Sequence, residues 1–268
     1  MRYRPGMSRR SRPRLRRSFA PLLALGACAA PATRNGVPNP PELPVPVVAT
    51  NASPAPSLDS DLRPAFAELG LPPRSQGPRP TCSIFTTVAA LEFACARATG
   101  HGERLSTEFC NWAANAANGR HDDGDFFHFA LSGYERYGIC PEAMLPYAGA
   151  FDAQLVPSPD ALVAAGRLLG GTAPRLHVRW IRPGTGTRGL DDAQFADVLA
   201  TLAAGWPVAA GSAHSRLLVG YRADPSAPGG GVFYTLDSAL ARFAEVTAEY
   251  VHTDICDAFA VEVAPAGT

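Results

Sequence analysis

The sequence predicts an α+β fold with two lobes, in which a helical first half is followed by a half made mainly of strands. Between residues 81 and 137, apolar side chains recur at helical spacing. After about Gly171, short apolar runs are separated by Gly and Pro, which is typical of strands and turns. Because helices and strands are segregated along the chain, the pattern favours two layers or lobes over alternating βαβ units. With 46% hydrophobic residues among 268, and no internal repeat, the chain can build one sizeable core.

Three helices are predicted in the first half. The first begins after a Pro- and Gly-rich loop that ends at Pro80, the second begins at the capping residue Ser106, and the third ends at Gly138. The apolar face is expected at Phe85, Val88, Ala89 and Ala96 in the first helix and at Phe109, Trp112 and Ala113 in the second, while the third helix is expected over Phe126–Tyr137. A polar loop at residues 120–125 precedes the third helix, and its Gly124 leaves room for the backbone of a ligand.

The second half is predicted to hold one helix and several strands. The helix carries Phe195, Val198, Leu199 and Leu202 on one side and ends at Gly205. The strand-like runs are Leu176–Trp180, Pro207–Ala210, Ser215–Tyr221, Val232–Leu236 and Ala258–Val263. His214 therefore stands immediately before one strand, and Asp237 immediately after another.

Residues 1–28 are predicted to be an export signal. An arginine-rich start is followed by a short apolar run and then by small residues. Arg16-Arg17-Ser18-Phe19 resembles a twin-arginine signal, and Leu25-Gly26-Ala27-Cys28 resembles a bacterial lipobox, in which Cys28 is lipidated. A plain cleaved signal peptide is the alternative for each motif. We expect an exported protein of the bacterial envelope or periplasm that is held at the membrane only through a lipid anchor on Cys28.

Residues 29–60 are predicted to be a disordered tether, because eight prolines exclude helix and sheet interiors. The folded domain is then expected over residues 61–268, with a helical lobe at about 80–170 and a β-rich lobe at about 171–264. Eight arginines lie in the first 17 residues, so without them 16 basic residues face 24 acidic ones, a net charge of −8. This charge disfavours nucleic acid as a partner. We expect a monomer.

Cys82 is the candidate nucleophile. It falls in the first turn of a predicted helix, where unpaired backbone N–H groups and the macrodipole favour the thiolate. The alternative is a small buried hydrophobic residue, which is the commoner role of a free cysteine. Partners elsewhere in the chain must decide between the two.

Four further cysteines follow, namely Cys95, Cys110, Cys140 and Cys256. Export favours disulfides, and if Cys82 is free these four allow three pairings, although they can also remain unpaired. Cys95 lies 13 residues beyond Cys82 on the same helix, about 20 Å away, so the two cannot form a redox pair. The cysteines and histidines lack the close spacing of a zinc site, and we expect neither metal nor cofactor.

His214 and Asp237 are the candidate partners of the thiol. Taken singly, each has an ordinary structural explanation: His214 can be a histidine at a strand edge, and Asp237 can be a turn-forming or capping residue. Their order and spacing change this interpretation, because His214 follows Cys82 by 132 residues and Asp237 follows His214 by 23. The first separation is typical of papain-type Cys/His enzymes.

From about Asp61 to Val263 the chain resembles the papain-like cysteine peptidases, particularly their compact bacterial versions. The motifs that carry the resemblance, in order, are Gln76-Gly77, Cys82, Leu105-Ser106, Tyr137-Gly138-Ile139-Cys140-Pro141-Glu142, Pro146-Tyr147, Trp206-Pro207-Val208, His214, Leu218-Val219-Gly220-Tyr221 and Phe233-Tyr234 leading to Asp237-Ser238. The resemblance implies a helical lobe with Cys82, a β-rich lobe with His214 and Asp237, and a cleft between them.

The resemblance also implies roles for these residues. Cys82 would attack a peptide carbonyl, His214 would hold the thiolate as an ion pair and protonate the leaving amine, and Asp237 would orient the imidazole. Gln76 would form an oxyanion hole together with the backbone N–H of Cys82, where about 3–4 kcal/mol per donor is typical.

Three features depart from the family pattern. Asp237 stands where the family usually has Asn, and Ala239 and Leu240 replace the Trp and Gly that usually follow Ser238. The familiar Cys-Gly-Ser-Cys-Trp signature is reduced to Arg-Pro-Thr-Cys-Ser around Cys82. Of the glycines that usually line the substrate backbone in this family, only Gly124 has a counterpart here.

We therefore expect a thiol hydrolase that acts on peptides or proteins in the bacterial envelope. Two alternatives remain open. One is a catalytically weak or inactive papain-fold module that binds an envelope partner, which the missing Trp and the sparse glycines favour. The other keeps the nucleophile but transfers the acyl group to an amine instead of water.

Overall fold

A computed structural model describes residues 58–170, 175–184 and 186–263. The predicted export signal, Cys28 and nearly all of the predicted tether lie outside the described residues. The helices are α1 (Arg63–Glu68), α2 (Cys82–Thr99), α3 (Thr107–Asn118), α4 (Phe127–Tyr137), α5 (Pro159–Gly170), α6 (Asp192–Ala203) and α7 (Ala248–Asp254), with short 3₁₀ turns η1 (Glu142–Met144) and η2 (Pro228–Gly230). The strands are β1 (Ser60–Asp61), β2 (Leu176–Arg182), β3 (Val208–Gly211), β4 (Arg216–Ala223), β5 (Gly231–Asp237), β6 (Arg242–Thr247) and β7 (Asp257–Val263).

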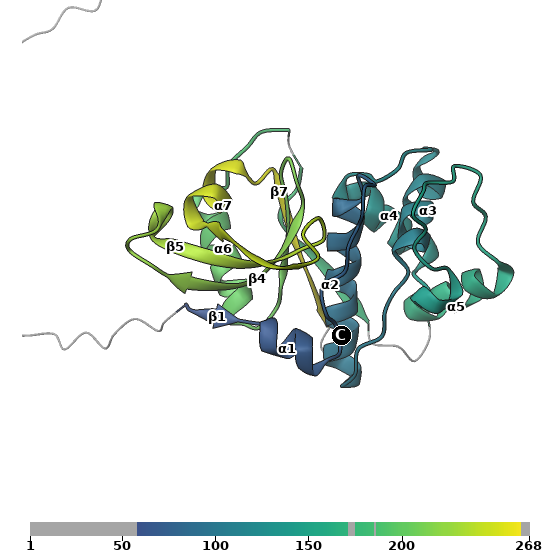
Figure 1. Cartoon of the computed structure of the whole chain (residues 1–268), viewed down its shortest axis with the longest axis horizontal. Coiled ribbons are helices and arrows are strands. Elements are labelled where there is room, and N and C mark those ends of the chain that lie inside the picture. The colour runs from purple at the N-terminus through teal and green to yellow at the C-terminus, as the bar shows by residue number, and fades with distance from the viewer. Residues whose placement is uncertain (1–57, 171–174, 185, 264–268) are drawn as a thin grey trace, which may run out of the picture. The chain divides into compact units, whose positions relative to one another are not determined.

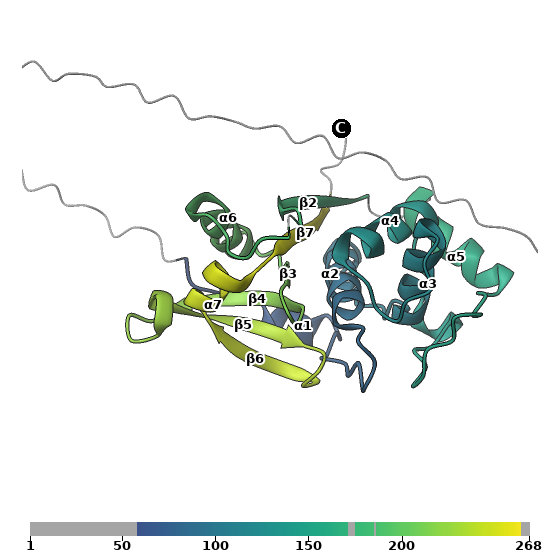
Figure 2. The same ribbon diagram turned by 90° about the horizontal axis from the view of Figure 1, so that it is seen from above.

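The strands form one antiparallel sheet in the part of the chain that the structure describes. Its order is β2-β7-β3-β4-β5-β6, and the short β1 pairs with β4. Helices α3, α4 and α5 gather on one side of α2, and the sheet lies on the other, with α6 and α7 beyond it (Figures 1 and 2). The predicted α+β class, with helices first and strands later, is confirmed.

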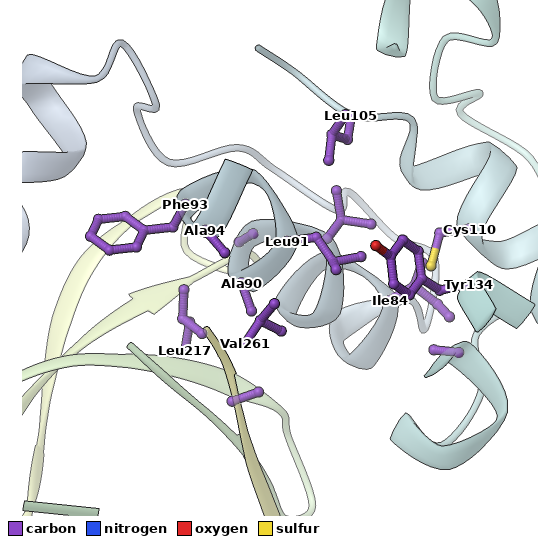
Figure 3. Close-up of a cluster of buried hydrophobic side chains, with 14 of the residues drawn as sticks. Ile84, Ala90, Leu91, Phe93, Ala94, Leu105, Cys110, Tyr134, Leu217 and Val261 are labelled. Atoms are coloured by element: carbon purple, nitrogen blue, oxygen red, sulfur yellow. The ribbon is translucent and has the colours of Figure 1, made fainter. Parts of the chain in front are cut away.

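Helix α2 is buried on all sides, which differs from the single apolar face that the sequence predicts. Thirteen of its 18 residues are buried. Figure 3 shows Leu91 on the side of Tyr134, from α4, while Ala90 faces Leu217 and Val261 of the sheet. The helix therefore forms the layer between the helices and the sheet, so every side of it needs small or apolar residues.

The five predicted strands and the four predicted helices are all present, with ends shifted by at most a few residues. Helices α1, α5 and α7 and strands β1 and β6 lie where the sequence reading placed no element. Helices α1 and α7 and strand β1 are short, and β6 has no fully buried residue, so the apolar periodicity that reveals an element is weak in these four. Helix α5 has 12 residues and an amphipathic pattern, and it was missed all the same. None of the described helices is both long and apolar enough to cross a membrane.

The start of the described chain is fixed to the sheet. Ser60 lies opposite Tyr221 of β4, and the carboxylate of Asp59 accepts a hydrogen bond of 2.8 Å from the backbone of Ala223. Helix α1 then buries Phe66, which stacks on Phe93 of α2 with ring centroids 4.5 Å apart. This segment therefore belongs to the core.

Candidate active site

Cys82 is the first residue of α2, as the sequence predicts. Its backbone N–H has no preceding helical carbonyl to bond, and the thiol is partly exposed in a pocket of about 640 Å³. Burial acts to raise the pKa of the Cys82 thiol, but hydrogen bonds from His214 and Ser215 outweigh it, and the pKa lies below its usual value. The site favours the thiolate.

His214 and Asp237 meet because their strands are paired. His214 precedes β4, Asp237 ends β5, and the two strands run antiparallel, so the start of one lies beside the end of the other. His214 Nε2 lies 2.9 Å from Asp237 Oδ1, which leaves Nδ1 for the thiol of Cys82. Hydrogen bonding to Cys82 and to Asp237 raises the pKa of His214, against the effect of its burial.

The carboxylate of Asp237 is 2% exposed and fully engaged. Besides His214, Oδ1 accepts hydrogen bonds from the backbone N–H groups of Ala239 (2.9 Å) and Leu240 (3.2 Å), and Oδ2 accepts one from Arg216 Nε (2.8 Å). Burial acts to raise the pKa of Asp237, but its hydrogen bonds to His214 and Arg216 keep it below the usual value. The turn after Asp237 thus holds the carboxylate in place through backbone donors.

Arg216 is the centre of a second layer of contacts behind His214. Its guanidinium donates to the His214 carbonyl (3.3 Å) and to the hydroxyl of Tyr250 (3.1 Å). Tyr250 shares a hydrogen bond of 2.6 Å with Ser212, whose hydroxyl donates to the same His214 carbonyl (2.8 Å). Hydrogen bonds therefore join the backbone at His214 to Arg216 and, through Ser212 and Tyr250, to helix α7.

Gln76 is buried, and its amide has a defined orientation. Its Oε1 accepts a hydrogen bond of 2.7 Å from Ser238, and its Nε2 donates one of 2.9 Å to the Arg79 carbonyl. The backbone N–H of Gln76 also donates to the Ser238 carbonyl (3.0 Å). Because an amide nitrogen carries two hydrogens, one remains after the bond to Arg79. Ser238 therefore joins Gln76 to the turn that follows Asp237.

Arg79 anchors the loop before Cys82. Its buried guanidinium pairs with Glu108 of α3 (2.6 Å) and with Asp123 (2.8 Å), and it lies over the ring of Tyr147. The Tyr147 hydroxyl donates to the Gln76 carbonyl (2.9 Å) and shares a hydrogen bond with Thr81 (2.8 Å). Tyr147, from the predicted Pro146-Tyr147 motif, therefore bonds to both ends of the loop between Gln76 and Cys82.

Gly124 lines the same pocket as Cys82, and its backbone explains why glycine is needed there. It has φ +81°, and a Cβ atom would lie 2.1 Å from the carbonyl oxygen of Pro80. Glycine therefore lets the 120–125 loop pack directly on the loop before Cys82. The predicted substrate contact of Gly124 remains a prediction.

All five described cysteines are free thiols in this structure. Of the possibilities left open by the sequence, Cys95, Cys110, Cys140 and Cys256 therefore follow the one without disulfides. Burial raises the pKa of Cys95 and of Cys110 to about 12 and that of Cys140 to about 11. A raised pKa disfavours the thiolate, so these three thiols are less suited than Cys82 to act as nucleophiles. Over the described ranges, no three Cys, His, Asp or Glu side chains form a group that could hold a metal ion.

The architecture is similar to that of solved cysteine proteases. Digestive procathepsin L 3 of Tenebrio molitor larval midgut is 17% identical, with a TM-score of 0.57 over 82% of this chain and 73% of that one. This chain has a papain-like fold. Xylellain, a cysteine protease from Xylella fastidiosa, is 16% identical with a TM-score of 0.58 over 78% of this chain and 87% of that one. The proform of the ragweed pollen allergen Amb a 11, a cysteine protease, is 19% identical, with a TM-score of 0.56 over 80% of this chain and 67% of that one.

The chain matches no protein-family model, and no curated protein matches it by sequence. Identities of 16–19% show a shared papain-like fold and leave the chemistry to this chain's own residues.

Three site residues were missed in the sequence. Arg216 and Asp257 are each the first residue of a strand and are each followed by four buried residues, and Tyr250 lies in the short helix α7. A charged residue at the first position of a buried strand is the signal that would have drawn attention to Arg216 and Asp257, because such a charge requires a nearby partner. Tyr250 carries no comparable signal, since its contact with Arg216 depends on tertiary packing.

Proposed function

We propose that this chain is a cysteine-type peptidase that hydrolyses peptide bonds. The observation that supports it most strongly is the convergence of Cys82, His214 and Asp237 from three separate elements, with a thiol pKa below its usual value. A thiol and an imidazole that share a proton beside an open pocket form the usual arrangement for nucleophilic attack on a carbonyl.

The proposed reaction has two stages. The Cys82 thiolate attacks the peptide carbonyl carbon, a C–S bond forms, and the carbonyl oxygen takes the negative charge. Imidazolium His214 then gives its proton to the amine nitrogen as the C–N bond breaks. In the second stage His214 removes a proton from water, the hydroxide attacks the thioester, and the C–S bond breaks to release the acid and restore the thiol.

Two hydrogen-bond donors would stabilise the negative charge on the carbonyl oxygen. One is the backbone N–H of Cys82 at the start of α2, and the other is the remaining Nε2 hydrogen of Gln76, whose amide Ser238 orients. Asp237 would keep His214 in the tautomer with a proton on Nε2 and balance the imidazolium charge.

The test uses a fluorogenic peptide pool together with a thiol-directed epoxide. We expect the epoxide to modify Cys82 and the Cys82→Ala variant to lose both labelling and cleavage. Cys95→Ala is the matched control, because it removes a thiol of the same helix whose pKa is raised to about 12, and it should keep both. Equal cleavage by Cys82→Ala and the unaltered chain would refute the peptidase proposal, and a chain that neither labels nor cleaves would fit the binding module.

We further propose, from the sequence, that the enzyme acts in the bacterial envelope with Cys28 lipidated. Expression with a radiolabelled fatty acid is the direct test: the unaltered chain should incorporate label and sediment with membranes, while Cys28→Ala should do neither.

A further inference from the structure

The pocket beside Cys82 contains a carboxylate that the proposed chemistry does not use. Asp257 is the first residue of β7, and it pairs with Gly211 at the end of β3. A Cβ atom at Gly211 would lie 1.8 Å from Asp257 Oδ1, and one at Gly184 would lie 3.5 Å from Oδ2. The carboxylate thus occupies the space that the missing side chain at Gly211 leaves open, on the wall of the pocket.

Asp257 is only 8% exposed, yet its side chain forms no hydrogen bond or ion pair with any residue that the structure describes, and only more distant charges act on it. The other carboxylates of the pocket differ in this respect. Asp123 pairs with Arg79 (2.8 Å), and Asp125 pairs with Arg120 (2.9 Å). Asp122 on the rim also pairs with Arg120. Asp257 is therefore the carboxylate of this pocket that has capacity for a new partner.

The charges around Asp257 do not satisfy it. His128 and Arg182 act on it electrostatically from a distance, and Arg182 donates to the Cys256 carbonyl (2.9 Å) and to Thr187. Burial raises the pKa of Asp257. A carboxylate held nine-tenths buried without a hydrogen bond costs stability, and a cation from a ligand would relieve that cost.

We propose that this pocket binds an arginine or lysine side chain of the substrate, close to the scissile bond, through an ion pair with Asp257. The inference rests on the proposed peptidase function, because it places the side chain in the pocket that Cys82 also lines. The volume of about 640 Å³ accommodates a long side chain. Phe126 on the rim is 65% exposed and offers an apolar surface for the methylene stem of such a side chain.

The test has a cleavage arm and a binding arm. In the first, the full chain digests a peptide library of mixed sequence, and mass spectrometry records the three residues on each side of every cut. We expect Arg and Lys to be enriched at one fixed position. In Asp257→Asn, the ratio of kcat/KM for an arginine over a norleucine substrate should fall about 10- to 100-fold, which is the range for losing a hydrogen bond to a charged group. Asp122→Asn, which removes a rim charge already paired with Arg120, should change that ratio less than about threefold.

The binding arm does not require chemistry. Fluorescein-labelled hexa-arginine and hexa-glutamine are titrated against Cys82→Ala and against Cys82→Ala carrying either Asp257→Asn or Asp122→Asn. We expect the arginine peptide to lose affinity with Asp257→Asn and to keep most of it with Asp122→Asn. Thermal unfolding accompanies each variant, and Asp257→Asn should melt no lower than the unaltered chain, because it removes an unpaired buried charge.

The outcomes separate the two proposals. Cleavage without basic enrichment, or an unchanged substrate ratio in Asp257→Asn, would overturn the pocket assignment while the peptidase survives. Absence of cleavage together with Asp257-dependent binding of the arginine peptide would overturn the peptidase and support the cationic pocket. Equal effects of Asp257→Asn and Asp122→Asn on binding would show attraction to a general negative surface and overturn the assignment.

Discussion

The buried carboxylate of Asp237 is hydrogen-bonded to both His214 and Arg216. Oδ1 faces the imidazole of His214, and Oδ2 faces the guanidinium of Arg216. Arg216 also restrains the rise of the His214 pKa, because its positive charge lies near the imidazole, while it fixes the carboxylate in position. A neutral Asn would not attract an arginine in this way, which gives a physical reason why Asp occurs together with Arg216 here.

Replacing Arg216 with Met tests this balance. The pKa of His214 is raised by Cys82 and Asp237 and lowered by Arg216, so loss of Arg216 should raise it further. The imidazolium would then persist to higher pH, and the alkaline limb of the kcat/KM profile should move to higher pH. We also expect kcat to fall by up to about 100-fold at its optimum, because the imidazole loses part of its support. A pH–rate profile measures both effects.

Arg222→Met is the matched control for that experiment. Arg222 lies on the same strand β4 and pairs with Asp224 (2.8 Å), away from Asp237. Its profile should match that of the unaltered chain. A shift of the Arg216→Met limb towards lower pH would contradict the shared-carboxylate explanation.

At the residue scale, sequence reasoning located the residues that stand at element boundaries. Cys82 follows a Pro-rich loop, and His214 and Asp237 flank apolar runs, so each is visible as a break in a pattern. The clamp made by Arg216 and Tyr250 depends on strand register and on the docking of α7, neither of which a single sequence specifies. The unpaired state of Asp257 likewise becomes visible only once its neighbours are placed.

At the scale of elements, the loop before α2 is held by an ion-pair cluster, not by regular structure. Arg79 is 4% exposed and joins this loop to α3 through Glu108 and to the 120–125 loop through Asp123. The Arg79 carbonyl also accepts the hydrogen bond that orients Gln76. The stability of this loop and the orientation of Gln76, the proposed oxyanion donor, therefore depend on the same residue.

We expect Arg79→Met to lower the free energy of unfolding by about 3–5 kcal/mol, because Glu108 would be left as an uncompensated buried charge. Cleavage by the folded fraction should also fall, since the Gln76 amide loses its support. Urea denaturation and single-turnover kinetics measure the two effects. In the comparison variant Arg188→Met, which alters a 70% exposed arginine paired with Asp254, the unfolding free energy should stay within about 0.5 kcal/mol. Equal effects of the two variants would disprove the anchoring role of Arg79.

Most elements with an apolar period could be predicted, but α5, an amphipathic helix of 12 residues, was missed. The sequence indicated α2, α3, α4 and α6 and five of the strands, whereas β1, β6 and α7 are too short or too exposed to be read. Helix α2 was predicted with only one apolar face, because Ser83, Thr86 and Thr87 do not count as apolar but are buried between the two layers.

At the scale of the whole molecule, the fold begins at the sheet and not at the first long helix. Asp59 and β1 bond to β4, and Phe66 of α1 is in the core. A chain that starts at Leu58 should therefore match the full chain in melting temperature and cleavage. A chain that starts at Gly70 loses Phe66 together with β1 and should be destabilised by at least the 3–5 kcal/mol of a large core deletion. Calorimetry compares the three, and equal melting of the two shortened chains would exclude a structural role for residues 58–69.

The position of Cys82 at the tip of the buried helix α2 has a practical consequence. The same 18 residues supply the sulfur and the centre of the core, so the thiol cannot keep its activated state once that helix leaves its neighbours. The fraction of molecules that the epoxide modifies in a heated sample would then report the surviving native population directly.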